Sequence, residues 1–378
     1  MDAAGNLYGD THSGGGTPGG DKGGTVFTLA PPEAGETTWT ETILQYWNDQ
    51  SSSGPTGPLT MWNGTLYGVF DGYEGPGEMF TLTPSGANWT YKEIWDAQPY
   101  GDLGNSVTVG PFGNLYYTTW VGYGPARKRV PGTPTVGLYR LAPDQNIKSP
   151  KPILVSSGPV ITPILLLDTK TIYAYVEGSD TGSSCSTGCG SVVQIVPSGP
   201  RQWTTNTIWN FTGGADGGLP LGSLIKGKHG VLFGSTSVGG ASGLGTVFSL
   251  TPPEAGQTAW TETTLWSFSG TDGSNPSNTL LRDSTGALYG SAVSGGSAGC
   301  GLVFRLAPPP AGQTTWTEST LYTFLGNSAK DGCNPVGQLV ADAAGTLYGD
   351  TAQGGKPQNY GVVYSLTGTG FAAYTNPH

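Results

Sequence analysis

The amino-acid sequence predicts an all-β protein, a seven-bladed β-propeller of four-stranded antiparallel blades. A short phrase, typically Leu-Tyr-Gly, recurs seven times at intervals of 49 to 60 residues, which is the length of one four-stranded β unit with its loops. No segment shows the 3.6-residue apolar period of a capped helix. The seven copies are Leu7-Tyr8-Gly9, Leu66-Tyr67-Gly68, Leu115-Tyr116-Tyr117, Ile172-Tyr173-Ala174, Leu232-Phe233-Gly234, Leu288-Tyr289-Gly290 and Leu347-Tyr348-Gly349.

Each repeat contains four predicted strands, A to D, and the fifth copy shows them best. Strand A covers residues 223–225, strand B 232–236, strand C 245–250 and strand D 260–268. These segments alternate in polarity or are rich in β-branched and aromatic residues. The segment 252–256, Pro-Pro-Glu-Ala-Gly, separates strands C and D and is predicted to be a turn, because proline cannot donate a hydrogen bond to a sheet.

The repeats are expected to form one domain, residues 1–378, with the 64 glycines and 29 prolines falling at regular intervals. A separate small core then lies between each pair of neighbouring sheets. Two stacked smaller domains and a linear β-solenoid are the alternatives, but a solenoid needs much shorter coils and no linker-like break interrupts the intervals. The expected repeat boundaries are about 1–50, 51–99, 100–157, 158–213, 214–270, 271–326 and 327–378.

The two ends of the array depart from the pattern. Residues 1–5 align with residues 341–345, so strand A of the first repeat has no counterpart in the sequence. Residues 371–374 are predicted to form strand D of the last repeat. We expect a three-stranded first blade or a trimmed chain, with a terminal segment borrowed for closure as the alternative.

Composition and charge restrict the partners. The net charge is −10 and only 11% of residues are charged, which argues against a nucleic-acid partner. The longest apolar run, around Ile164 to Leu167, is too short to span a membrane. The first residues do not form a signal peptide, so we expect a monomer that is secreted or held at a bacterial cell surface after its leader has been removed.

Four cysteines offer two disulfides. Cys185 and Cys189 are close enough to close a local bridge. Cys300 precedes strand C of the sixth repeat and Cys333 precedes strand A of the seventh; because strand directions alternate, both connections emerge on one face. A bridge between them is therefore expected, which favours an oxidising compartment. A zinc site is the alternative, but the histidines do not cluster with the cysteines in the sequence.

Three repeated segments carry a family resemblance: Gly245 to Pro253, Trp260 to Leu265, and Gly286 to Gly290. Through them the chain resembles the bacterial choice-of-anchor tandem repeat GloVer-containing proteins. The resemblance covers nearly the whole chain and is strongest in repeats 1, 5, 6 and 7. It implies an exported, surface-associated protein built of glycine-rich, propeller-like repeats, and it brings no catalytic residues with it.

Candidate functional residues appear where the copies differ from one another. At the third position after the glycine slot of the phrase, four consecutive repeats carry large functional side chains and the other three carry small ones. Strands A and B are the inner pair of a propeller blade, so these side chains are expected around the mouth of the central channel. The four are His12, Asp71, Trp120 and Glu177; nearby lie Tyr73, Tyr123, Tyr175, Tyr360, Asp10, Asp350, Arg127 and Arg129.

Aromatic rings beside carboxylates suit a sugar, whose faces stack on rings while its hydroxyls form hydrogen bonds. We therefore expect a polysaccharide or oligosaccharide ligand and a glycoside hydrolase with Asp71 and Glu177 as general acid and base, at a separation that suits inversion. His12 is a third catalytic candidate. A lyase would instead use His12 or Tyr123 as the base, with Arg127 and Arg129 neutralising a uronate. A non-catalytic surface or adhesion scaffold that binds glycans is the alternative from another class.

Other repeated residues have structural explanations. Asp216, Asp272 and Asp331 each begin an Asp-Gly segment that ends in proline, and a carboxylate that accepts backbone N–H groups in such a turn explains them. No cofactor is expected; structural calcium is the one metal that this motif leaves open. The tryptophans that begin strand D are interpreted as blade-packing residues: Trp39, Trp89, Trp203, Trp260 and Trp316.

Overall fold

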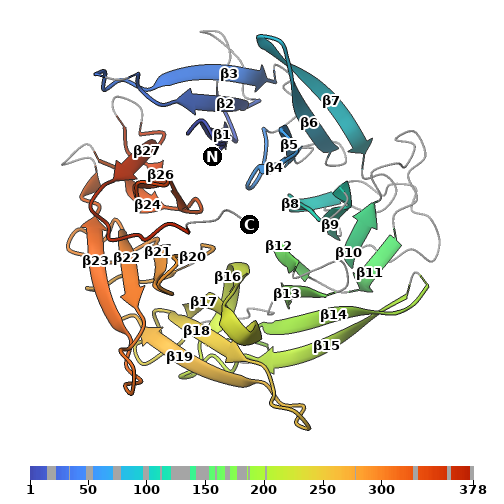
Figure 1. The fold of residues 1–378 in the computed structure, drawn as a ribbon, viewed down its shortest axis with the longest axis vertical. Coiled ribbons are helices and arrows are strands. Elements are labelled where there is room, and N and C mark those ends of the chain that lie inside the picture. Colours follow the sequence, from blue (N-terminus) through green and yellow to red (C-terminus); the bar gives the residue numbers. More distant parts are fainter. Residues whose placement is uncertain are drawn as a thin grey trace. The chain divides into compact units, whose positions relative to one another are not determined.

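The computed structural model of the chain is built of β-strands (Figure 1). The residues that it describes form seven antiparallel sheets and no α-helix, which is the seven-bladed β-propeller predicted from the sequence. They group into two compact units, residues 1–172 with 195–205 and residues 173–194 with 206–378. The described residues are 1–14, 23–33, 35–47, 54–70, 78–96, 102–110, 113–120, 137–141, 153–157, 160–166, 171–176, 185, 188–200, 202–276, 278–326, 331–355 and 359–374.

The first unit contains the first three sheets, and in each the strands pair in chain order. The first sheet has the three strands β1 (Leu7–Thr11), β2 (Thr25–Ala30) and β3 (Thr40–Tyr46). The second has β4 (Thr60–Trp62), β5 (Thr65–Phe70), β6 (Glu78–Ser85) and β7 (Asn88–Asp96). The third has β8 (Asp102–Val109), β9 (Leu115–Trp120), β10 (Gly137–Leu141) and β11 (Ile153–Ser157).

The fourth sheet, whose residues are divided between the units, has β12 (Val160–Leu166), β13 (Ile172–Val176), β14 (Ser191–Gly199) and β15 (Gln202–Asn210). The second unit contains the remaining three sheets. The fifth has β16 (Gly218–Lys226), β17 (Leu232–Val238), β18 (Thr246–Thr251) and β19 (Thr261–Ser267). The sixth has β20 (Leu281–Arg282), β21 (Leu288–Ala292), β22 (Leu302–Ala307) and β23 (Thr317–Thr323).

The seventh sheet is built around one long strand, β26 (Leu347–Gln353). Two short strands, β24 (Cys333–Pro335) and β25 (Val340–Ala341), both pair with β26 and together take the place of strand A. The last strand of the sheet, β27 (Val362–Leu366), also pairs with β26. Strand D is therefore missing from this sheet in the part of the chain that the structure describes.

The register between strands B and C is the same in six sheets. The leucine of the phrase lies opposite a leucine of strand C each time, as Leu232 opposite Leu250 shows. These six blades can therefore be compared with one another position by position. The remaining pairs are Leu7 with Leu29, Leu66 with Leu82, Leu115 with Leu141, Leu288 with Leu306, and Leu347 with Leu366.

The glycine of the phrase makes room for an aromatic ring. A Cβ atom on Gly290 would lie against the ring of Phe304, and one on Gly68 would lie against the ring of Phe80. Both phenylalanines come from strand C of the same blade and are 0% exposed. The repeat keeps glycine here because a larger residue would displace the ring from the core.

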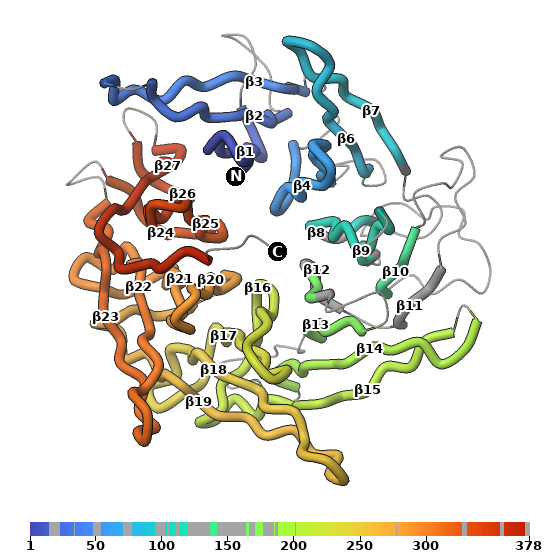
Figure 2. The backbone as a smooth tube through the Cα atoms, viewed as in Figure 1, coloured from blue at the N-terminus to red at the C-terminus, as the bar shows by residue number. Residues whose placement is uncertain are grey.

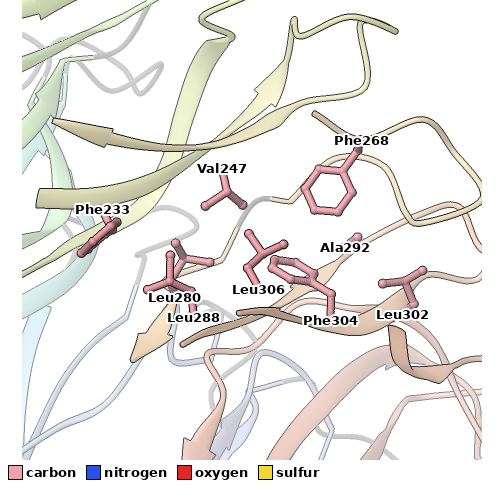
Figure 3. Packing of buried hydrophobic residues seen from close by; sticks show 9 residues of the cluster. All are labelled: Phe233, Val247, Phe268, Leu280, Leu288, Ala292, Leu302, Phe304 and Leu306. Atoms are coloured by element: carbon pink, nitrogen blue, oxygen red, sulfur yellow. The ribbon is translucent and has the colours of Figure 1, made fainter. Parts of the chain in front are cut away.

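The core consists of separate clusters between neighbouring sheets, as expected from the repeats. In one of them Phe233, Val247 and Phe268 of the fifth blade pack against Leu288 and Phe304 of the sixth (Figure 3). All but Phe233 are fully buried. The tube through the Cα atoms shows the strands of these two blades following one another in the second unit (Figure 2).

The ends of the array confirm one prediction and correct another. The first sheet has the three strands β1, β2 and β3, as expected. Residues 371–374 were expected to form strand D of the last repeat, and this is wrong: they form no strand. Gly368 and Gly370 adopt φ values of 67° and 73° and turn the chain after β27. Phe371 then packs on Tyr289 of the sixth blade, with ring centroids 5.2 Å apart.

Both predicted disulfides form. Cys185 bonds to Cys189, and Cys300 bonds to Cys333, with Cα atoms 4.9 Å and 4.5 Å apart. The second bridge joins the B–C connection of the sixth blade to the first strand of the seventh. Because disulfides persist in oxidising compartments, the chain is suited to the outside of the cytoplasm.

Candidate functional site

A groove of about 1000 Å³ lies in the second unit between residues of the fourth and fifth blades. One wall comes from β13, β14 and β15, and the other from the connection between strands C and D of the fifth blade. Every lining residue that the structure describes is uncharged. They are Tyr173, Gln194, Asn206, Thr207, Ile208, Trp209, Asn210, Pro252, Pro253, Thr258, Ala259 and Trp260.

The rings of the groove belong to a repeated packing contact. Tyr173 meets Trp260 edge to face, with ring centroids 5.8 Å apart. Tyr8 and Trp89 repeat this contact at 5.8 Å, and Phe233 and Trp316 repeat it at 6.2 Å. The second residue of the phrase thus contacts the tryptophan of the next blade, which supports the packing role predicted for these tryptophans. Tyr173 is only 5% exposed, so the partly buried Trp260 is the ring that can offer a face to a ligand.

Amide side chains occupy the groove at positions where other blades carry different groups. Gln194 donates from Nε2 to the Tyr173 hydroxyl at 2.9 Å. Asn206 and Asn210 are exposed on β15, at the positions of Thr263 and Ser267 in the next blade. Amides can both donate and accept hydrogen bonds, so the groove offers both partners to a neutral polar ligand.

Trp209 lines the groove, but its indole N–H is not exposed there. Its Nε1 atom is buried and has no hydrogen-bond partner among the described residues. Trp266, at the same position of the next blade, donates instead to Asp272 Oδ2 at 2.9 Å. A buried donor without a partner costs about 1–3 kcal/mol, and because Nε1 is enclosed by the protein this N–H is not offered to a ligand in the groove.

Two carboxyl groups of strand D have raised pKa values. Burial raises the pKa of Glu262 to about 7, and the negative charge of Asp216 adds to the rise while a hydrogen bond from Thr264 opposes it. Burial also raises the pKa of Glu318, with Asp272 adding to the rise. The same arrangement in two successive blades belongs to the repeat and does not single out a catalytic acid. The fourth blade has Thr205 at this position, which leaves the groove wall neutral.

The sequence-predicted site residues fall into two groups. Six of them, Asp71, Tyr73, Tyr123, Arg127, Arg129 and Glu177, lie outside the described residues. Of the others, His12 is exposed just after β1, Trp120 ends β9, and Tyr360 is 86% exposed before β27. The meeting of His12, Asp71, Trp120 and Glu177 at one opening therefore stays a prediction.

Two acidic candidates occupy one structural level. Asp10 lies opposite Val26, and Asp350 lies opposite Val363, three residues before the paired leucine of strand C in each blade. Burial raises the pKa of Asp350, whose carboxylate lies against Gly337. Their predicted role in substrate binding is not tested by these contacts.

Tyr175 was predicted to be a stacking platform, and the structure places it elsewhere. Its side chain is 1% exposed, and its hydroxyl lies where a Cβ atom on Gly234 would be. Burial raises the pKa of this hydroxyl. A ring enclosed in the core cannot stack on a sugar, so the predicted binding role of Tyr175 is wrong in this structure.

The repeated Asp-Gly segments have the structural role predicted for them. Asp216 accepts a hydrogen bond from the Thr212 N–H at 3.0 Å, Asp272 from the Ser269 N–H at 2.7 Å, and Asp331 from the Leu325 N–H at 2.9 Å. Among the described residues, no group of three or more histidine, cysteine or acidic side chains is arranged to hold a metal ion. No helix in this part of the chain is long and apolar enough to cross a membrane.

Sequence reasoning missed the groove. The available signal was that Gln194, Asn206 and Asn210 interrupt the repeat pattern together, on the two outer strands of one blade. Sequence differences among the repeats were easier to recognise on the inner strands, where they introduce charged residues. On the outer strands amides replace small residues, and this difference is less conspicuous in the sequence.

Comparisons with known proteins agree with the repeat architecture. Among solved structures, a puromycin-hydrolyzing peptidase from Mycobacterium tuberculosis matches with a TM-score of 0.57 and 13% identity, over 93% of this chain and 48% of that one. A candidate 6-phosphogluconolactonase from Bacteroides uniformis matches with a TM-score of 0.53 and 13% identity, over 97% of each chain. At such identity these likenesses show the fold alone.

Sequence comparison identifies the repeats. No curated protein is similar in sequence to this chain. Residues 172–375, more than half of the chain, match the Gloeobacter/Verrucomicrobia repeat, the family that the phrase and its flanking strands resemble. The chain is therefore a member of the Gloeobacter/Verrucomicrobia repeat family.

Proposed function

We propose that this protein binds an uncharged glycan in the groove lined by Tyr173 and Trp260. The observation that carries the proposal is a groove of about 1000 Å³ in which aromatic rings and amide side chains occur together and none of the described lining residues is charged. Sugars bind through ring stacking and through directional hydrogen bonds to their hydroxyls, and this lining supplies both.

The electrostatics favour a neutral ligand over an acidic one. Among the described residues no lysine, arginine or histidine lines the groove, so none of them offsets the desolvation of a uronate or sulfate group. The chain as a whole carries a charge of −10, which repels polyanions at low ionic strength. A neutral hexose or pentose polymer meets neither obstacle.

Two groups in the groove have defined tasks in the proposed complex. The partly buried Trp260 presents a ring face to one sugar unit. The exposed Asn206 and Asn210 side chains bind the hydroxyls of an adjacent unit.

We predict that Trp260→Ala weakens glycan binding about tenfold, equivalent to ~1.4 kcal/mol. The same substitution at Trp316 is the matched control, because Trp316 makes the equivalent contact with Phe233 and does not line the groove. Affinity electrophoresis and calorimetry against neutral glucan, mannan, xylan and galactan, with polygalacturonate and alginate as acidic comparisons, measure the effect.

A second variant distinguishes a loss of binding from a folding defect. Asn206→Ala with Asn210→Ala alters two exposed side chains and should leave the melting temperature within a few degrees of the parent while weakening binding. Equal losses for Trp260→Ala and Trp316→Ala, with no loss for the asparagine pair, would place the binding site outside the groove. Binding confined to the acidic glycans would contradict the proposed ligand class.

Glycan cleavage by Asp71 and Glu177 is a separate proposal: it rests on their positions in the repeat, and neither residue is among the described residues that line the groove. Asp71→Asn and Glu177→Gln should each lower the release of reducing ends at least a hundredfold, because general acid and base catalysis contributes about 10²–10⁴-fold. Ultraviolet absorbance measured in parallel would report unsaturated products of a lyase. If both variants release sugar at the parental rate, Asp71 and Glu177 are not the catalytic pair; a parent that binds without any product is a non-catalytic scaffold.

A further inference from the structure

The last strand of the seventh sheet has one edge without a strand. In each of the other six sheets strand C pairs on both sides, as β18 does with β17 and β19. Strand C of the seventh sheet, β27, pairs with β26, and in the described residues no strand pairs with its other edge. The chain continues past β27 but turns away toward the sixth blade.

Burial at one register position shows what this edge lacks. Val363 lies three residues before the paired leucine of strand C and is 47% exposed. The residues at the same position in five other blades are all 0% exposed: Val26, Met79, Leu138, Val247 and Val303. An apolar position that is fully buried in those blades is thus half exposed in the last one.

Strand D supplies aromatic side chains at this level of the blade. Trp266 lies opposite Val247, and Tyr322 lies opposite Val303. Two residues further on, Phe268 and Phe324 belong to the same core clusters as these valines and are 0% and 1% exposed. An aromatic-x-Phe pair at the end of strand D therefore packs beside the valine of strand C.

The edge of β27 has none of the features that usually protect an exposed strand. Natural edges are blocked by charged side chains, by proline or by a bulge. The sequence of β27 is Val-Val-Tyr-Ser-Leu, and it pairs with β26 without a register shift. Its flanking residues, Gly361 and Thr367, are also uncharged.

We propose that the free edge of β27 binds one extended segment of strand D chemistry: a strand rich in threonine and serine that ends in an aromatic-x-Phe pair. The segment would add to the sheet in antiparallel orientation, with main-chain hydrogen bonds giving affinity and the two rings covering Val363. The inference is independent of the groove and of glycan binding. It assigns a peptide-binding surface to the seventh blade.

A peptide with the sequence of residues 316–324, Trp-Thr-Glu-Ser-Thr-Leu-Tyr-Thr-Phe, labelled with fluorescein, tests the proposal by fluorescence anisotropy. Saturable binding is expected, with at least a tenfold loss when the tyrosine and the phenylalanine of the peptide are both replaced by alanine. N-methylation of the amides that face β27 should abolish binding, whereas N-methylation of the alternate amides should not. If both methylated peptides still bind, or if neither of them binds, strand addition is contradicted.

Variants of the protein locate the site. Val363→Lys should abolish peptide binding, and Ile43→Lys is the matched control, because Ile43 is 42% exposed on a different sheet. Equal losses in both variants would mean nonspecific hydrophobic binding and would overturn the proposal. Sedimentation of the parent protein without peptide tests whether a second copy of the chain occupies the edge instead. A dimer that Val363→Lys converts to a monomer would show that a second copy, and not the proposed segment, pairs with β27.

Discussion

Replacing Cys300 and Cys333 together by serine lowers the free energy of unfolding by about 4 kcal/mol. The bridge closes a loop with a sequence separation of 33, and in the chain-entropy account a loop of this size restricts the unfolded state by about that amount. Guanidinium unfolding of the oxidised parent and the double variant, followed by tryptophan fluorescence, measures the difference.

The hydrogen bonds around this bridge show why other contacts do not compensate for the loss of stability when it is removed. The Asn334 N–H donates to the Cys300 carbonyl at 2.8 Å, and this contact joins one blade to the next. Preceding junctions contain the same contact, from Asn275 to Leu244 at 2.8 Å and from Leu219 to Cys189 at 2.7 Å. The three donors, Leu219, Asn275 and Asn334, have φ values of 52°, 56° and 58°, a left-handed conformation that asparagine adopts more readily than leucine. The disulfide holds the third junction in this geometry covalently.

The second bridge is the matched control. Cys185 and Cys189 have a sequence separation of 4, so the same account gives about 2 kcal/mol for their replacement by serine. The loss should therefore be roughly twice as large for the Cys300–Cys333 bridge. Equal losses, or a larger loss for the short loop, would contradict the entropic explanation.

The fold class could be predicted because the repeated Leu-Tyr-Gly motif contains residues that pack against several parts of the blade. Leu232, Phe233 and Gly234 each meet a fixed requirement: a leucine opposite a leucine of strand C, a ring against the tryptophan of the next blade, and space for the ring of strand C. The leucine pair recurs in six sheets and the other two requirements in several of them, so periodic sequence predicts periodic structure. The last strand D was predicted wrongly because residues 371–374 were placed by the count of strands, whereas Gly368 and Gly370 set the direction of the chain.

The candidate site was harder to predict because strand register fixes the position of a residue along the blade but not the direction in which its side chain points. Tyr175 occupies the level of Asp10 and Asp350 in the repeat, yet its ring lies inside the core. The outcome depends on the neighbouring blade, where Gly234 leaves room for the tyrosine hydroxyl. The groove likewise depends on residues from two blades that are distant in the sequence. Such contacts follow from the packing of sheets, which a single repeat does not encode.

Asp283→Ala is expected to lower the free energy of unfolding by about 3 kcal/mol. Asp283 is 0% exposed and holds the turn between strands A and B of the sixth blade. Its carboxylate accepts hydrogen bonds from the Thr285 and Ala287 N–H groups at 2.9 Å and from the Tyr289 hydroxyl at 3.2 Å. Alanine would leave these buried donors without partners, and each unsatisfied donor costs about 1–3 kcal/mol.

The chain contains a matched control for this change. Asp342 holds the equivalent turn of the seventh blade, accepting from the Ala344 and Thr346 N–H groups at 2.9 Å and from the Tyr348 hydroxyl at 3.0 Å. Asp342 is less buried than Asp283, so water can replace the lost acceptor. We expect Asp342→Ala to cost about 1 kcal/mol.

The control also has a defined pH dependence. Partial burial opposes ionisation of Asp342, but hydrogen bonds from the Thr346 N–H and the Tyr348 hydroxyl outweigh it and hold the pKa of Asp342 below its usual value. A carboxyl whose folded pKa is lowered stabilises the protein above its unfolded pKa, and this contribution is lost as the pH falls through the folded value. The cost of Asp342→Ala should therefore be full at pH 7 and shrink below about pH 4.

The larger cost at Asp283 also reflects the segment that covers it. Tyr374 donates from its hydroxyl to the Asp283 carbonyl at 3.0 Å, and the Ala372 N–H donates to the carboxylate at 3.4 Å. Tyr374→Phe removes this hydrogen bond and the one that the hydroxyl accepts from Arg282 at 3.0 Å, leaves the turn intact and should cost about 1 kcal/mol. Chemical denaturation of the three variants at pH 7 should therefore rank Asp283→Ala well above Asp342→Ala and Tyr374→Phe. A cost for Asp283→Ala no greater than that for Asp342→Ala would show that burial under residues 371–374 does not strengthen this turn.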